Sequence, residues 1–167
     1  MIIKGRDVPI QRYVPPLDKP KAIIVDIDGT IAHRVPGPDG TIRSPYNYSR
    51  VNEDALDSVI AGVVHLHRTF LDYDVVLCSG RDDSCYQDTL DWLNRYDIEH
   101  DALLMRSTEG DRDENGKLPD WIVKYRIFNE KIRHNYNVKF VLDDRNQVVQ
   151  MWRELGLVCL QVADGNF

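Results

Sequence analysis

Two pairs of aspartates are the residues in this sequence best suited to chemistry. Asp26 and Asp28 follow one short apolar, β-branched run, and Asp143 and Asp144 follow another. A buried strand that ends in carboxylates needs a cation or hydrogen-bond donors to offset their desolvation. If both runs are central strands, the four acids converge, and like charges so close cannot all stay ionised without a counter-ion. Because every donor is an oxygen, we predict a Mg²⁺ site rather than a zinc site. The plainer alternative is that Asp26 is a turn residue and Gly29 the glycine of that turn.

A second polar cluster, Ser79-Gly80-Arg81, also follows an apolar run. We expect Arg81 to lie at the mouth of a site, and the alternative is a structural guanidinium that clamps a loop. Arg43 lies in a segment rich in proline and glycine. That segment could cover the site as a small lid, and the alternative is plain solvent exposure of Arg43.

Asp120 and Lys124 are four residues apart on an expected helix, so they share one helical face with the acid first. By itself this spacing is typical of a surface salt bridge. The alternative is a functional lysine whose position a nearby carboxylate steers.

These side chains need a scaffold, and the hydrophobic pattern indicates one. Short apolar segments predict strands at 22–26, 75–78, 102–105, 138–142 and 157–162, with a further short strand near 1–3. Between them the pattern predicts helices that begin near Asn52 as N-cap, near Asp83 and at Pro119, and over 147–155, with Gly156 as the stop before the last strand. Strands that alternate with helices predict an α/β fold, a Rossmann-like parallel sheet with helices on both faces.

The polar clusters all fall at the predicted carboxyl ends of strands, where parallel sheets bind ligands. Residues 1–20 carry four prolines and are expected to be an irregular leader or linker, and 21–167 to be one domain. The segments 32–50 and 106–118 are expected to be loops. They are the only cap material that the sequence predicts.

Composition indicates the compartment of the protein and the kinds of partner it can bind. The chain has 167 residues, a formal charge of −6 and three cysteines without a CxxC pair. The odd cysteine count argues against a disulfide framework and favours a reducing cytoplasm. No apolar run approaches the length of a membrane span, and residues 1–12 show no secretory signal. The negative charge opposes non-specific wrapping of nucleic acid but leaves recognition of a strand end open.

Taken together and in this order, the motifs resemble those of haloacid dehalogenase-type phosphatases. The resemblance rests on Asp26-x-Asp28-Gly-Thr, on Ser79, on Lys124 and on Asp143-Asp144, and it spans about residues 21–167. It implies that Asp26 is the nucleophile that forms an aspartyl-phosphate.

The same resemblance implies roles for the other residues. Asp28 would be the general acid and base, and Lys124 would place a positive charge on the phosphoryl group. Ser79 and the Gly80 amide would donate to phosphate oxygens. Mg²⁺ would be held by Asp26, by the backbone carbonyl of Asp28 and by Asp143 or Asp144.

A narrower resemblance is carried by the segments 142–156 and 161–167, by Ser79-Gly-Arg81 and by 120–128. These segments are similar to the phosphatase domain of bacteriophage-type polynucleotide kinase-phosphatases. The resemblance implies removal of a 3′-phosphate, or a 2′,3′-cyclic phosphate, from RNA or DNA ends, and adds Arg43, Arg81 and Asp120 to the essential set.

The sequence has no room for the kinase domain of those enzymes, and Gly110 to Leu118 departs from a P-loop because Leu118 stands where Ser or Thr is required. We therefore predict no 5′-kinase activity in this polypeptide, with a separate kinase or ligase chain as a partner.

Two other functions compete with this one. One is a 5′(3′)-nucleotidase that acts on mononucleotides, because haloacid dehalogenase-type enzymes share the chemistry and differ in what covers the site. The short cap segments favour a polymer end. The other is a catalytically silent module that binds strand ends, which the full set of motif residues argues against.

Overall fold

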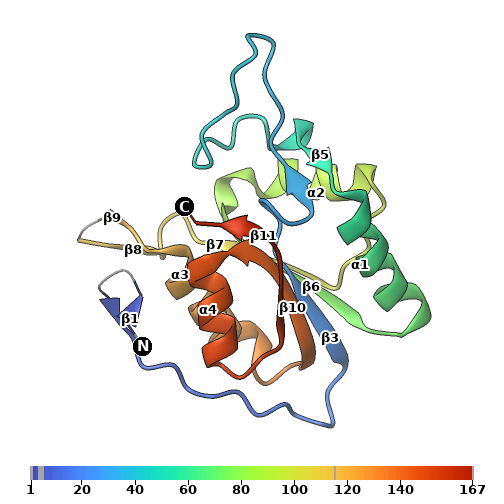
Figure 1. Ribbon diagram of the computed structural model, residues 1–167, viewed down its shortest axis with the longest axis vertical. Helices are drawn as coiled ribbons and strands as arrows, with labels where there is room; N and C mark the ends of the chain where they lie inside the picture. Colours follow the sequence, from blue (N-terminus) through green and yellow to red (C-terminus); the bar gives the residue numbers. More distant parts are fainter. Residues whose placement is uncertain (1, 4–5, 115, 167) are drawn as a thin grey trace.

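The computed structural model describes residues 2–3, 6–114 and 116–166 and shows one central parallel sheet (Figure 1). Its strand order is β11-β10-β3-β6-β7, and every pairing is parallel. The strands are β3 (Lys21–Val25), β6 (Asp74–Asp82), β7 (Ala102–Arg106), β10 (Asn137–Arg145) and β11 (Cys159–Gly165). The chain moves outward from β3 to β7 and then returns to the other side of β3. The predicted α/β fold is confirmed, and its topological switch lies between β3 and β10.

The central strands are apolar because both of their faces are covered. Along β3, Ile23 and Val25 pack into one hydrophobic cluster, and Ala22 and Ile24 pack into another on the opposite face. All four are at most 1% exposed. Burial on both sides explains why these strands appear as continuous apolar runs instead of alternating patterns.

Two pairs of helices form the outer layers (Figure 1). The cluster of Ile23 includes residues of α1 (Ser58–Phe70) and α2 (Tyr86–Arg95). The opposite cluster includes residues of α3 (Asp120–Ile127), its π-helical continuation η3 (Phe128–Ile132), and α4 (Asn146–Glu154). Gly156 follows α4 with a φ of +91°, so the predicted glycine stop is confirmed.

The first helix begins later than the sequence predicts. Its N-cap is Asp57, whose side chain accepts bonds from the amides of Val59 and Ile60, both at 3.0 Å. Asn52, the predicted cap, lies instead in a short 3₁₀ turn, η1 (Val51–Glu53). The prediction was wrong because a further strand, β5 (Ala55–Leu56), extends the chain between turn and helix by pairing with β4 (Ala32–His33).

Both predicted loops carry local structure. The connection between β4 and β5 projects from the body of the molecule at the top of Figure 1. The 106–118 segment contains a hairpin, β8 (Arg112–Asp113) and β9 (Gly116–Lys117), so the prediction of a plain loop was incomplete. A second short 3₁₀ element, η2 (Asp83–Cys85), precedes α2.

Tyr13 and Pro20 contact the start of β10, at the sheet end that is remote from the acids. Residues 8–20 form no helix or strand. Before them, β1 (Ile2–Ile3) pairs with β2 (Arg6–Asp7). Met1, which belongs to the predicted first strand, lies outside the described residues. Tyr13 is buried, and its hydroxyl donates to the Tyr136 carbonyl at 2.7 Å and accepts from the Val138 amide at 3.0 Å.

Within the described ranges, no helix is both long and apolar enough to cross a bilayer.

Candidate active site

Two adjacent strands bring three carboxylates to one point. Asp26 follows β3, and Asp143 and Asp144 lie in the last part of β10, which pairs with β3. The Asp26 amide donates to the Leu142 carbonyl at 2.9 Å, which extends the strand pairing into the site. One oxygen from each of the three carboxylates lies within 4.8 Å of the other two, and all three residues are buried. Backbone register therefore sets their convergence.

Lys124 reaches this cluster from α3. Its Nζ lies 2.6 Å from Asp26 Oδ1 and 2.8 Å from Asp143 Oδ2, and the residue is only 2% exposed. The solvated surface lysine considered from the sequence is therefore excluded. Asp143 also accepts from Trp152 Nε1 at 3.2 Å, so α4 helps to fix this carboxylate.

The cluster has more negative charge than one lysine can balance. Burial raises the pKa of Asp26 well above its ordinary value; Lys124 opposes this rise, and Asp143 and Asp144 add to it. Burial and the neighbouring Asp143 raise the pKa of Asp144 to about 6. Burial lowers the pKa of Lys124, but Asp143 and Asp26 outweigh it, so this pKa is raised. A divalent cation fits this surplus of buried oxygen ligands.

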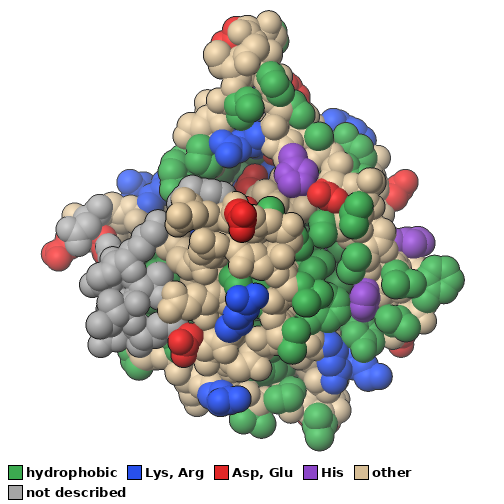
Figure 2. Space-filling model, viewed as in Figure 1, with side chains coloured by type: hydrophobic (Ala, Val, Ile, Leu, Met, Phe, Trp, Pro, Cys, Tyr) green, Lys and Arg blue, Asp and Glu red, His purple; other side chains and the backbone are tan. Residues whose placement is uncertain are grey.

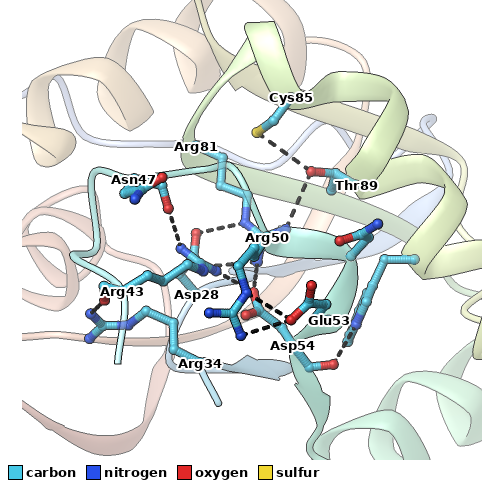
Figure 3. Close-up of polar contacts among 12 residues, drawn as sticks. Asp28, Arg34, Arg43, Asn47, Arg50, Glu53, Asp54, Arg81, Cys85 and Thr89 are labelled. Carbon is cyan, nitrogen blue, oxygen red and sulfur yellow. Dashed lines mark hydrogen bonds and ion pairs between the residues drawn. The ribbon is translucent and has the colours of Figure 1, made fainter. Parts of the chain in front are cut away.

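Asp28 lies outside the carboxylate cluster and is held by Arg81. Arg81 Nε lies 2.8 Å from Asp28 Oδ2, and Nη2 lies 2.9 Å from Asp28 Oδ1, a bidentate pair (Figure 3). The guanidinium is buried, whereas the Asp28 side chain is 34% exposed and lines the cavity described below. The contact of Asp28 with a metal was expected through its backbone carbonyl and stays a prediction.

A second carboxylate, Asp54, joins Arg81 to Arg43. Asp54 Oδ2 accepts from Arg81 Nη2 at 2.7 Å and from Arg43 Nη2 at 2.6 Å, and Asp54 is 1% exposed (Figure 3). Its carbonyl also accepts from Trp92 Nε1 at 2.7 Å. Charge-assisted bonds of this kind are strong when they are shielded from water. Asp54 is thus the shared anchor of two arginines.

Arg43 is only 8% exposed, which excludes the plain solvent exposure considered from the sequence. Its Nη1 donates to the Asn47 carbonyl at 2.8 Å. The Asn47 amide in turn donates to the Ser44 carbonyl at 3.0 Å, which closes a turn with Pro45 at its second position. Arg43 therefore fixes a turn of the projecting connection to the Asp54 anchor.

Asp120 forms ion pairs with Arg106 and Arg145. The Asp120–Lys124 pair that helical spacing predicts is not formed, because Lys124 turns inward to Asp26 and Asp143. Arg106 Nε also donates to the Gly80 carbonyl at 3.1 Å. A Cβ on Gly80 would lie 2.9 Å from the Asp120 carboxylate carbon, so glycine permits this close approach.

Ser79 is fully buried beneath the cavity and accepts the Arg81 amide at 3.1 Å through Oγ. The strand pairing shifts register between Ser79 and Asp82, and such irregularities redirect side chains at strand ends. In the turn after β3, Gly29 has a φ of +85°, and a Cβ there would lie 2.2 Å from Asp144 Oδ2. Glycine is required at this position on both grounds.

A cavity of about 250 Å³ contains the accessible parts of these groups. We call its buried lining residues Asp26, Lys124 and Asp144 the floor, and the more exposed Arg34 and Tyr46 of the projecting connection the rim. In Figure 2, acidic and basic side chains lie next to each other below the projecting part. The expected covering role of the 32–50 segment is consistent with this lining.

Sequence reasoning missed Asp54 and Arg106. Neither belongs to a recognisable motif, and their roles depend on partners distant in the sequence. Arg145 stands beside Asp144 in the sequence, yet its pairing with Asp120 has no sequence signal. Tyr48 was also missed; burial, then Asp28 and Asp120, raise its pKa to about 12.

The three cysteines are free and buried. Burial raises the pKa of Cys78 and that of Cys159 to about 12, and burial also raises the pKa of Cys85. These thiols are packing groups rather than nucleophiles.

Comparisons with known proteins identify the family of the chain. The model of the polynucleotide kinase PNKP phosphatase domain, a haloacid dehalogenase-type family, matches residues 20–167. A protein of Autographa californica nuclear polyhedrosis virus, described as a bifunctional polynucleotide kinase/RNA ligase, is 41% identical over 147 residues, which cover 86% of this chain and 19% of that protein.

Two solved structures of a Pnkp1/Rnl/Hen1 complex, one of them described as an RNA repair complex, contain a similar chain. Their TM-scores are 0.80 and 0.79, at 38% and 39% identity. The matches cover 98% and 97% of this chain but only 49% and 52% of those chains. The chain thus spans about half, or less, of the length of these relatives.

Proposed function

Because the chain belongs to the family of polynucleotide kinase PNKP phosphatase domains, we propose that it removes the 3′-phosphate, or a 2′,3′-cyclic phosphate, from RNA or DNA ends. The observation that carries the proposal is the buried cluster of Asp26, Asp143 and Asp144 with Lys124 on the floor of an open cavity. Residues 21–167 form the phosphatase domain in this proposal, and 1–20 precede it as a leader.

Asp26, Asp143 and Asp144 are the residues that would hold Mg²⁺, together with the backbone carbonyl of Asp28. When bound, the ion supplies positive charge that reduces repulsion between the aspartate and the phosphate. Asp26 attacks phosphorus in line, its oxygen forms the new bond, and the bond to the 3′-oxygen breaks, which leaves an aspartyl-phosphate. Lys124 holds the Asp26 carboxylate in place and offers a positive charge to the phosphoryl oxygens.

Asp28 moves the protons. In the first step a protonated Asp28 donates to the departing 3′-oxygen. In the second an ionised Asp28 takes a proton from the water that attacks phosphorus, the bond from phosphorus to the Asp26 oxygen breaks, and inorganic phosphate leaves with the Asp26 carboxylate restored. The bidentate Arg81 contact fixes the position of the Asp28 carboxylate. Ser79 and the Gly80 amide hold phosphate oxygens. Asp120 holds Arg106 and Arg145 in place through its two ion pairs.

The names of the relatives support a proposal about which other enzymes act on the same substrate. We propose that a kinase or ligase, in the same or another polypeptide, acts on the same strand ends in the cytoplasm. The phosphatase needs neither of them for its chemistry. No 5′-kinase activity is expected from residues 1–167.

A substrate panel tests the proposal. Phosphate release is compared for oligonucleotides with 3′-phosphate, 2′-phosphate, 2′,3′-cyclic phosphate or 5′-phosphate ends, and for free 3′- and 5′-mononucleotides, with and without Mg²⁺. Fastest release from 3′-phosphorylated oligonucleotides with Mg²⁺ is expected. Faster turnover of mononucleotides would indicate a nucleotidase instead.

Two variants control the panel. Asp26→Asn should lose release altogether, whereas Asp91→Asn, an exposed carboxylate on α2, should retain it. A wild-type protein that binds strand ends but hydrolyses no ester would favour the silent module.

A further inference from the structure

Arg34 and Tyr46 both line the cavity, yet neither takes part in the chemistry proposed above. Both belong to the connection between β4 and β5, and both stand at the rim rather than on the floor. Their side-chain types, a guanidinium and a phenol ring, are those that proteins use for phosphates and for unstacked bases.

Arg34 differs from the other arginines at the cavity. Arg81 is paired with Asp28 and Asp54, and Arg145 is paired with Asp120. Across the described parts of the chain, Arg34 forms no ion pair, and its hydrogen bond is from Nη1 to the Arg43 carbonyl at 2.9 Å (Figure 3). Its remaining N–H groups and its full charge are therefore available to an anion.

Tyr46 is held at the rim with its ring uncovered. It lies in the turn of residues 44–47, whose Asn47 carbonyl accepts from Arg43, so its backbone is anchored to the Asp54 network. The residue is nevertheless 63% exposed. An anchored backbone with an open aromatic face is suited to stacking, because little ordering entropy is left to lose on binding.

We propose that Arg34 and Tyr46 form a subsite for the nucleotide next to the 3′-terminal one. Arg34 binds the phosphate that joins the two nucleotides, and Tyr46 stacks on the base of the penultimate nucleotide. The inference rests on the proposed function. It assigns the preference for a polymer end to these two residues, because a mononucleotide has neither that phosphate nor that base.

Binding to a chemically silent background tests the subsite without turnover. In Asp26→Asn protein, Kd is measured by fluorescence anisotropy for a 5′-labelled single-stranded hexauridylate with a 3′-phosphate. Competition with uridine 3′-monophosphate gives the Kd of the mononucleotide. Added Arg34→Gln and Tyr46→Ala should each reduce the preference for the hexamer over the mononucleotide by about tenfold.

Matched variants separate the subsite from general damage. Arg95 is exposed and, like Arg34, donates to a backbone carbonyl, that of Asn52 at 2.7 Å. Tyr86 is an exposed tyrosine, 42% accessible, that does not line this cavity. Arg95→Gln and Tyr86→Ala should leave the preference unchanged. Arg34→Lys should restore part of the preference, and Arg34→Gln should reduce the salt dependence of hexamer binding by about one phosphate contact.

The outcomes are distinct from those of the proposed function. If wild-type protein prefers 3′-phosphorylated oligonucleotides but Arg34→Gln and Tyr46→Ala keep that preference, the subsite is overturned and the phosphatase proposal stands. If the Asp26→Asn protein binds hexamer and mononucleotide equally, the subsite is likewise overturned. A wild-type protein that binds the hexamer through Arg34 and Tyr46 but releases no phosphate would overturn the proposed function alone.

Discussion

The floor and the wall of the cavity are stabilised in different ways. On the floor, Asp26, Asp143 and Asp144 are placed by the backbone pairing of β3 and β10, and their charges repel one another. We call the network of Arg43, Asp54 and Arg81 the wall. There the two arginines are placed by side-chain ion pairs that meet at Asp54. The floor thus holds the reactive carboxylates close together although they repel one another. The wall is held in place by ion pairs that all depend on the Asp54 carboxylate. The same substitution should therefore have opposite consequences in the two regions.

The largest effect is expected on the floor. Asp26→Asn removes the nucleophile, so kcat for a 3′-phosphorylated oligonucleotide should fall by at least about ten-thousandfold. Because the change also removes one of three repelling carboxylates and leaves Lys124 paired with Asp143, the free energy of unfolding should stay the same or rise. Phosphate release and urea denaturation measure the two quantities. A marked loss of stability would show that the floor is held by the Asp26–Lys124 pair rather than by strand register.

Asp54→Asn makes the matching change in the wall. It leaves Arg43 and Arg81 buried without their shared counter-charge, so the free energy of unfolding should fall by about 3–5 kcal/mol. Urea denaturation measures this, with the exposed Asp91→Asn as the control. A loss below about 1 kcal/mol would mean that the bidentate Asp28 contact suffices for Arg81 and that Asp54 is not the anchor.

Gly29→Ala tests how closely the floor is packed. The added Cβ would collide with Asp144 Oδ2, so Mg²⁺ affinity, measured by metal titration of activity, should fall by about tenfold. Gly40→Ala is the control, because Gly40 has a similarly positive φ of +78° but open space around it. An equal loss of Mg²⁺ affinity in both variants would trace the effect to backbone strain rather than to Asp144.

The smallest effect is expected at the edge of the wall. Lys117 of the β8–β9 hairpin pairs with Asp82 at 3.0 Å and lies 5.5 Å from the centre of the Tyr48 ring. Its side chain is 39% exposed, so Lys117→Ala should lower the free energy of unfolding by less than about 1 kcal/mol. A larger loss in urea denaturation would show that the hairpin supports the wall as strongly as Asp54 does.

The sequence predicts the floor far better than the wall for a physical reason. Asp26 and Asp143 lie at the ends of buried strands. Parallel register brings the ends of neighbouring strands together, so hydrophobic pattern and motif order suffice. Asp54 lies outside any periodic element, and its two arginines are 11 and 27 residues away. Such contacts follow from tertiary packing, which local pattern does not encode.

The first helix shows the same limit. Asn52 and Asp57 are both good N-cap residues, and the choice between them depends on whether the chain between them pairs with β4. That pairing involves residues more than twenty positions upstream. The hydrophobic spacing therefore located the helix but could not locate its first turn.

The burial of the three cysteines has a practical consequence. With every native thiol enclosed and its ionisation suppressed, a single cysteine introduced at an exposed position of the projecting connection, such as Thr41, would be the most reactive sulfhydryl of the folded protein. A maleimide dye could be attached there without first removing native residues. The position of this segment could then be followed optically as a strand end arrives.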